Sequence, residues 1–135
     1  MLQNNQKLKQ FIPDGEWEGF YIYSSKKGEH KMNCFFLFKD GNIKGYGSDD
    51  IGNFEWDGRY DEELNINMIK LYSRHTVNYK GCADENGIWG TWIILRISKG
   101  GFHIWPKKNT GNKSVFEKKQ NFIADISAMI YGNIS

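Results

Sequence analysis

Short apolar and aromatic runs, separated by turn-forming residues every 8 to 14 residues, extend from residue 15 to residue 106. Runs of this length, rich in aromatic and β-branched residues and bounded by Gly, Asn, Asp and Ser, are typical of β-strands. Asp40-Gly41 and Asn86-Gly87 are favoured dipeptides of tight hairpin turns. Such short breaks join only antiparallel neighbours, because a parallel crossover needs about a dozen residues or more. The predicted strands are Glu16–Tyr23, Lys31–Phe38, Asn42–Ser48, Asn53–Tyr60, Leu64–Tyr72, Thr76–Lys80, Gly87–Ile97 and Gly101–Trp105.

Eight consecutive antiparallel strands in an open sheet would leave two unpaired edges, and closing the sheet into a barrel removes them. The sequence therefore predicts an all-β fold, an eight-stranded antiparallel up-and-down barrel at residues 15–106. Its interior would be wide enough for side chains or one small ligand. Glycine lies beside or one residue past tryptophan in Trp17-Glu18-Gly19, Trp56-Asp57-Gly58 and Trp89-Gly90. Glycine within a strand permits sharp coiling and close packing of a neighbouring aromatic ring.

The segment after the barrel has a helical pattern. Ser114-Val115-Phe116-Glu117 has the form of a capping box, and apolar residues then recur at spacings of three, four and seven up to a stop at Gly132. We expect a C-terminal amphipathic helix at 114–131, joined by a linker at 107–113 and packed outside the barrel or across one end. Residues 1–14 form a polar lead.

Two predicted strands are apolar on both faces, which indicates an outer barrel wall that is covered at Lys31–Phe38 and Gly87–Ile97. The C-terminal helix is one candidate for the cover, and a protein partner is the other.

Charge and cysteine content exclude several classes of function. The net charge is +2 and the lysines are dispersed, so we expect no nucleic-acid binding. No run approaches the ~18 apolar residues of a membrane span, and residues 1–10 lack the apolar core of a signal peptide. Cys34 and Cys82 have no metal-ligand spacing and fit free thiols in a reducing compartment. We expect an intracellular, cytoplasmic protein with no membrane association, no metal and no cofactor.

Aromatic and polar side chains at positions able to face the interior are the candidate ligand-binding residues. In an aromatic-lined cup they would orient a small ligand through a few hydrogen bonds. The alternative is that they are barrel-end residues whose polar atoms reach water or backbone. Adjacent strand residues point to opposite faces, so Asp49-Asp50 is interpreted as a turn and not as a paired-carboxylate site. The candidates are Trp17, Tyr21, Tyr46, Tyr72, His75, Tyr79, Trp92 and His103, with Lys70 in the same run as Tyr72.

The residues Gly15-Glu16-Trp17-Glu18-Gly19 and Gly58-Arg59-Tyr60-Asp61 resemble the avidin and lipocalin-like (calycin) barrels, whose first strand begins with Gly-x-Trp. The stretches 47–54 and 101–106 also resemble a family of small barrels to which no activity is attached. The resemblance implies an eight-stranded up-and-down barrel with Trp17 packed at one end. The avidin ligand residues do not carry over, because Phe20-Tyr21-Ile22-Tyr23 lacks the polar ligand-binding Asn and Ser.

Three functional hypotheses follow. The first is a non-catalytic protein-interaction or assembly module that contacts a protein partner or a second copy through its apolar exterior. The second is an intracellular small-molecule-binding barrel of the calycin type, whose cup takes a small apolar or aromatic ligand. An enzyme would need His75 or His103 as a general base, and because no group that orients either one is evident, we expect no catalysis. An interior cavity of ~300 Å³ or more would favour the second hypothesis over the first.

Overall fold

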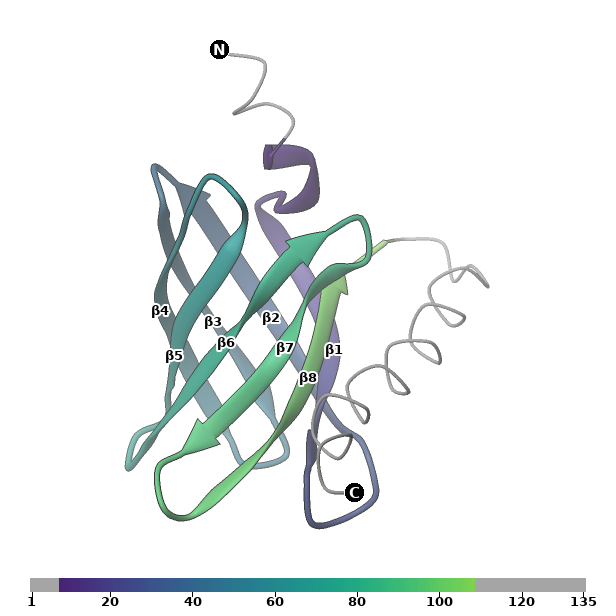
Figure 1. Cartoon of the computed structure of the whole chain (residues 1–135), viewed down its shortest axis with the longest axis vertical. Helices are drawn as coiled ribbons and strands as arrows, with labels where there is room; N and C mark the ends of the chain where they lie inside the picture. The colour runs from purple at the N-terminus through teal and green to yellow at the C-terminus, as the bar shows by residue number, and fades with distance from the viewer. Residues whose placement is uncertain (1–7, 109–135) are drawn as a thin grey trace.

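The computed structural model describes residues 8–108, which form a closed barrel of eight antiparallel strands (Figure 1). Each strand pairs with its neighbour in sequence, and β8 closes the barrel against β1. The predicted fold class is therefore confirmed. The predicted helix at 114–131 and the linker beyond Lys108 lie outside the described residues. The strands are β1 (Gly15–Tyr23), β2 (His30–Lys39), β3 (Asn42–Asp49), β4 (Asn53–Tyr60), β5 (Asn65–Leu71), β6 (Thr76–Asp84), β7 (Gly87–Ile94) and β8 (Ser98–Pro106).

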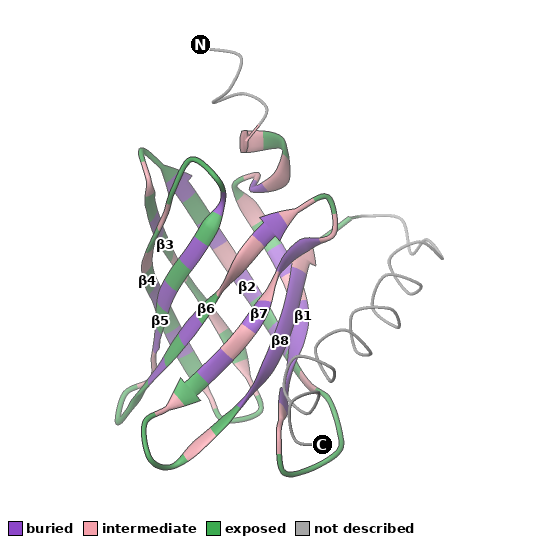
Figure 2. Cartoon of the chain, viewed as in Figure 1, coloured by how far each residue is buried: buried purple, intermediate pink, exposed green. Residues whose placement is uncertain are grey.

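Successive side chains along a strand point alternately into the filled interior and towards the outer wall, and the burial of the residues follows this alternation (Figure 2). On β5, for example, Ile66, Met68 and Lys70 are buried while Asn65 and Asn67 are exposed. A single cluster of buried apolar residues, drawn from all eight strands, fills the barrel. Its largest members include Trp17, Trp56, Phe36 and Phe102.

Inward-facing glycines allow the strands to coil closely enough to fill this interior. A Cβ added at Gly100 would lie 1.8 Å from the Ile22 carbonyl oxygen and 2.6 Å from Trp92 Nε1. Gly81 and Gly90 face each other across β6 and β7, and a Cβ on either would lie 2.1 Å from a backbone oxygen of the opposite strand. For the predicted Gly19, Gly58 and Gly90, close approach of the neighbouring strand is confirmed. The nearest atoms belong to backbone, Ile104 and Met68, and not to an aromatic ring.

One turn lies three residues before its predicted position. The sequence predicts a break at Ser98–Gly100, but β8 begins at Ser98 and the chain reverses at 95–97, where Ile97 N–H donates to the Ile94 carbonyl at 2.9 Å. The prediction was wrong because it took Gly100 as a turn residue. Gly100 instead lies within β8, where it allows the Trp92 ring to pack closely. Leu95 and Ile97 therefore lie on an exposed hairpin tip.

Within the described chain, the outer wall at β2 and β7, which the sequence predicts to be covered, is partly exposed. Leu37 on β2 is 50% exposed and Ile93 on β7 is 43% exposed. The outward residues that are buried lie on β1 and β8 instead, and include Phe20, Ile22 and His103 (Figure 2). Runs that are apolar on both faces do not identify a covered wall, because more than half of an ordinary protein surface is apolar.

The two ends of the barrel differ. A helical turn at 8–11 lies over one end (Figure 1), where Ile12 is fully buried and Trp17 Nε1 donates to the Pro13 carbonyl at 2.9 Å. We call this the closed end, and it also carries the turns that follow β2, β4 and β6. The turns that follow β1, β3, β5 and β7 surround the other end, which we call the open end.

Replacing Gly100 by alanine tests the close-packing argument. We expect Gly100→Ala to lower the free energy of unfolding by about 1–3 kcal/mol, because the new methyl group meets backbone and the Trp92 ring. Urea unfolding followed by tryptophan fluorescence measures the change. The control Ser48→Ala, at an exposed outward position, should change it by less than about 0.5 kcal/mol. Equal stability of Gly100→Ala and the wild type would contradict the argument.

Candidate functional site

A lysine side chain lies inside the barrel towards its open end. Lys70 is 1% exposed, and its position on β5 places it in the inward row with Ile66 and Met68. Its Nζ donates to Asp49 Oδ2 and lies 3.4 Å from the Tyr79 hydroxyl oxygen. Burial lowers the pKa of this ammonium group, and the Asp49 carboxylate opposes that effect. Five aromatic rings surround Nζ, with centroids at 4.3–5.7 Å: Tyr21, Phe54, Trp56, Tyr72 and Tyr79.

Asp49, the last residue of β3, uses its two carboxylate oxygens differently. Oδ1 accepts from the backbone N–H groups of Ile51 and Gly52 at 2.9 and 3.2 Å, which closes the turn to β4. Oδ2 accepts from Lys70 Nζ and from the Tyr72 hydroxyl. The side chain is fully buried. The turn role predicted for Asp49 is confirmed, and the structure adds an interior role.

Asp50 begins the same turn and reaches back to β1 and β2. Its Oδ1 accepts from the Tyr21 hydroxyl at 2.5 Å, and its Oδ2 lies 2.5 Å from His30 Nδ1. Tyr21 and His30 are cross-strand partners with stacked rings. Partial burial raises the pKa of Asp50, but the hydrogen bonds from Tyr21 and His30 outweigh it, so the pKa lies below the ordinary value of 3.8. The two adjacent carboxylates thus connect β3 to β1, β2 and β5 at the open end.

Little space remains beside this network. The cavity at the open end has a volume of about 20 Å³, which is room for about one water molecule. Pockets that enclose drug-sized ligands are some fifteen-fold larger or more, at about 300–1,000 Å³. Its walls are aromatic and aliphatic: Tyr21, Tyr23, Ile51, Tyr72, His75, Val77, Tyr79, Trp92 and Ile94.

Five of the eight predicted candidates line this one cavity, namely Tyr21, Tyr72, His75, Tyr79 and Trp92. Burial raises the pKa of Tyr21, Tyr72 and Tyr79, so all three hydroxyls stay protonated and able to donate hydrogen bonds at neutral pH. His75 stacks on the ring of Tyr72, and Trp92 Nε1 donates to the Ile22 carbonyl at 3.0 Å.

The other three candidates lie elsewhere. Trp17 packs at the closed end. Tyr46 points outward, is 60% exposed and stacks on Phe35. His103 faces the outer wall beside Phe20, and its Nε2 lies 2.7 Å from the Asn86 carbonyl oxygen. The structure therefore does not bring these three to the open-end cavity.

Asp50, which the sequence analysis assigns to a turn, and His30, which is not among the predicted candidates, belong to the open-end network. The sequence analysis also did not place Asp49 in the interior. The alternation of β3 could have shown this, because Asp49 lies on the same face of the strand as the inward Ile43, Gly45 and Gly47. An inward acid on β3 and an inward lysine on β5 near the same barrel end suggest an ion pair.

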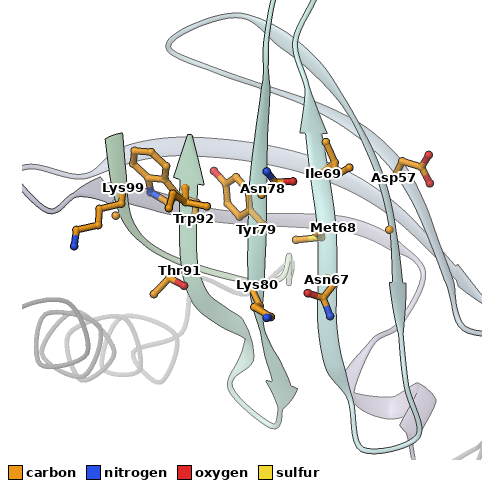
Figure 3. A pocket seen from close by; sticks show the side chains of 13 residues that line it. Asp57, Asn67, Met68, Ile69, Asn78, Tyr79, Lys80, Thr91, Trp92 and Lys99 are labelled. Atoms are coloured by element: carbon orange, nitrogen blue, oxygen red, sulfur yellow. The ribbon is translucent and has the colours of Figure 1, made fainter. Parts of the chain in front are cut away.

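A second hollow lies on the outer wall over β4 to β8 (Figure 3). It has a volume of about 690 Å³ and is open to solvent. Exposed aliphatic side chains, Ile69 and Ile93, alternate there with Asn67, Asn78 and Lys80. Tyr79 and Trp92 also line it, although both side chains are buried (Figure 3).

Within residues 8–108, no three His, Cys, Asp or Glu side chains are grouped so as to hold a metal ion. No helix in that range has the length and apolar character needed to span a bilayer. Cys34 is buried, and burial raises the pKa of its thiol to about 12. Its thiol is therefore protonated and unreactive at neutral pH.

The buried ion pair is tested by a double-mutant cycle. We expect Lys70→Met to lower the free energy of unfolding by about 3–5 kcal/mol, because it leaves the Asp49 carboxylate buried without its cation. Lys70→Met combined with Asp49→Asn should cost clearly less than the two single changes added together. Lys44→Met, which removes an exposed pair with Asp57, is the control, with a loss of about 1 kcal/mol or less. Additive losses in the cycle would contradict the coupling.

The Asp50 network has a pH signature. Its folded pKa lies below 3.8, so its contribution to stability is present above that pH and is lost as pH falls through the folded pKa. We expect Asp50→Asn to cost about 1 kcal/mol at pH 7 and less at pH 3, in urea unfolding measured across that range. Asp57→Asn serves as an exposed control. A cost for Asp50→Asn that is the same at pH 3 and pH 7 would rule out this role.

Comparisons of the chain with protein-family models, with curated proteins and with solved structures find no match.

Proposed function

We propose that this barrel is a non-catalytic protein-interaction module that contacts its partner at the open end. The observation that carries the proposal is the hairpin tip between β7 and β8, where Leu95 is 71% exposed and Ile97 is 79% exposed. Ile51, on the turn between β3 and β4 across the same end of the barrel, is 51% exposed. Large aliphatic side chains exposed together on one hairpin tip can mark an interaction site.

The interior supports the same proposal. Its volume is taken by the chain's own side chains, and Lys70 occupies the aromatic cage near the open end that would otherwise receive a ligand. Enclosing a ligand would require breaking the contacts of Asp49 and Lys70 or displacing Tyr72.

Absence of catalysis is part of this proposal. His75 is exposed and stacked on Tyr72, whereas His103 faces the outer wall of the barrel. These two histidines therefore do not share a site. The third histidine, His30, has Asp50 as an orienting group but does not line the open-end cavity. A general base needs a group that orients it and a cavity for substrate, and the 20 Å³ beside His75 offers little room.

A second candidate function, binding of a small molecule at the open end, is favoured by one observation. Tyr21, Tyr72, His75, Tyr79 and Trp92 converge on the same cavity. The up-and-down topology is also the one expected of a calycin, and membership of that superfamily is part of this second candidate. Binding there would require the turns at 50–52 and 72–75 to move apart.

Site-specific photo-cross-linking separates the two candidates. A photoreactive amino acid at Leu95 or Ile97, in cells that naturally produce the protein, should give one adduct of defined mass at both positions. The same group at Glu55, an exposed position on the outer wall of β4, should not give that adduct. Adducts that are absent, or identical at all three positions, would contradict the interaction module. Saturable one-to-one binding of an apolar fluorescent dye that is lost in Tyr79→Phe would instead favour the small-molecule candidate.

A further inference from the structure

The hairpin turns at the two ends of the barrel carry opposite charge. The open-end turns, at 24–29, 50–52, 72–75 and 95–97, contain four basic side chains and two acidic ones. The closed-end turns, at 40–41, 61–64 and 85–86, contain five acidic side chains and no basic one. The basic side chains are Lys26, Lys27, Arg74 and Arg96, and the acidic ones at the closed end are Asp40, Asp61, Glu62, Glu63 and Glu85.

The open end projects an apolar tip within this basic region. Leu95 and Ile97 flank Arg96, whose φ of 64° lies in the left-handed region that few non-glycine residues adopt. All three side chains are exposed, and the backbone turn is closed by the Ile97–Ile94 hydrogen bond. The tip is therefore a defined projection with a cation between two aliphatic side chains.

The closed end carries a hollow with the matching chemistry. A groove of about 740 Å³ lies between the helical turn at 8–11 and the turns that follow β2 and β4. Leu8, Ile12, Phe38 and Tyr60 supply its apolar lining. Its charged lining has more acidic than basic side chains: Asp40, Asp61 and Glu62 stand against Lys39, while Lys9 and Asp14 form an ion pair at 2.7 Å. Hydrogen bonds from Asn65 lower the pKa of Asp61, so this carboxylate is ionised at neutral pH.

We infer that the Leu95–Ile97 tip of one molecule docks into the closed-end groove of a second copy, giving head-to-tail association. The inference rests on the proposed function and identifies the partner as this chain itself. Among proteins with an acidic, apolar surface, a second copy is favoured because the same molecule carries a groove that matches its own tip in charge and apolar character. The tip and groove lie at opposite ends, so the contact is heterologous and leaves one free tip and one free groove on every assembly.

The association is expected to be weak and sensitive to salt. A single hairpin in a groove buries less area than the ~1,600 Å² of a standard stable interface. Attraction between the basic and acidic ends is screened as ionic strength rises. Sedimentation velocity of the full chain should therefore show a weight-average mass that rises with concentration above 15.7 kDa at low salt. The increase should shrink at 0.5 M salt.

Two variants test the geometry. The tip variant is Leu95→Ser with Ile97→Ser, and the groove variant is Asp40→Asn with Glu62→Lys. Asparagine tolerates the positive φ of 52° at residue 40. Each variant alone should stay monomeric, but a mixture of the two should form one-to-one dimers of about twice the monomer mass and nothing larger, because each retains one half of the contact. Leu37→Ser and Glu55→Lys, at exposed outer-wall positions, are the matched controls and should associate as the wild type does.

Several outcomes would overturn the inference. A wild type that stays monomeric at every concentration excludes self-association, and a mixture that fails to form dimers excludes a heterologous contact. Sedimentation with phosphatidylserine vesicles, without self-association, would assign the basic tip to a membrane surface. Thermal unfolding of each variant confirms that it is folded. A cross-link from Leu95 to a different protein in a chain that does not self-associate would overturn this inference and leave the proposed function intact.

Discussion

The ion pair between Asp49 and Lys70 organises the open half of the barrel. An ammonium group and a carboxylate are both removed from water there, and the desolvation of such a pair is offset only when the remaining polar atoms are also satisfied. The structure satisfies them through Tyr72, Tyr79 and the backbone of the β3–β4 turn. The faces of five aromatic rings add an attraction to the cation. These partners come from β3, β5 and β6 and from the turns at 50–52 and 72–75. The ion pair therefore holds these strands and turns together at the open end.

This arrangement also determines what the interior can do. In an eight-stranded barrel the enclosed space is just wide enough for side chains or one small ligand. Here inward glycines bring the strands close, while the Lys70 side chain and the rings around it occupy the remaining volume. An interior filled by its own polar network is rigid and specific, since partly satisfied alternatives are costly in a low-dielectric environment. Under the proposed function, recognition takes place at the surface, through the hairpin tip at 95–97.

Much of this architecture follows from local sequence rules, and the errors have identifiable causes. The eight strands and their antiparallel order follow from turn chemistry and period-two alternation, which are local. The Asp49–Lys70 pair joins residues 21 positions apart, and it depends on two strands sharing one barrel end. The turn at 95–97 was misplaced because Gly100 packs beneath Trp92, a tertiary constraint with the same local signature as a turn. Tyr46 and His103 were assigned to the cup on their side-chain type alone. Their positions in the alternation of β3 and β8 place both on the outer face.

The difference in charge between the two ends arises because the barrel topology places alternate turns of the sequence at the same end. In an up-and-down barrel, successive hairpin turns alternate between the ends, so every second turn in the sequence lies on the same side of the molecule. Basic residues occur in the first, fifth and seventh turns of this chain, whereas the second, fourth and sixth turns carry acids alone. Over the whole sequence the charges nearly cancel, to a net charge of +2, and the linear order of the turns shows no separation of charge. Once the turns are sorted by parity, the same charges become a dipole along the barrel axis. The exposed Leu95 and Ile97 lie at its basic end and the apolar groove at its acidic end.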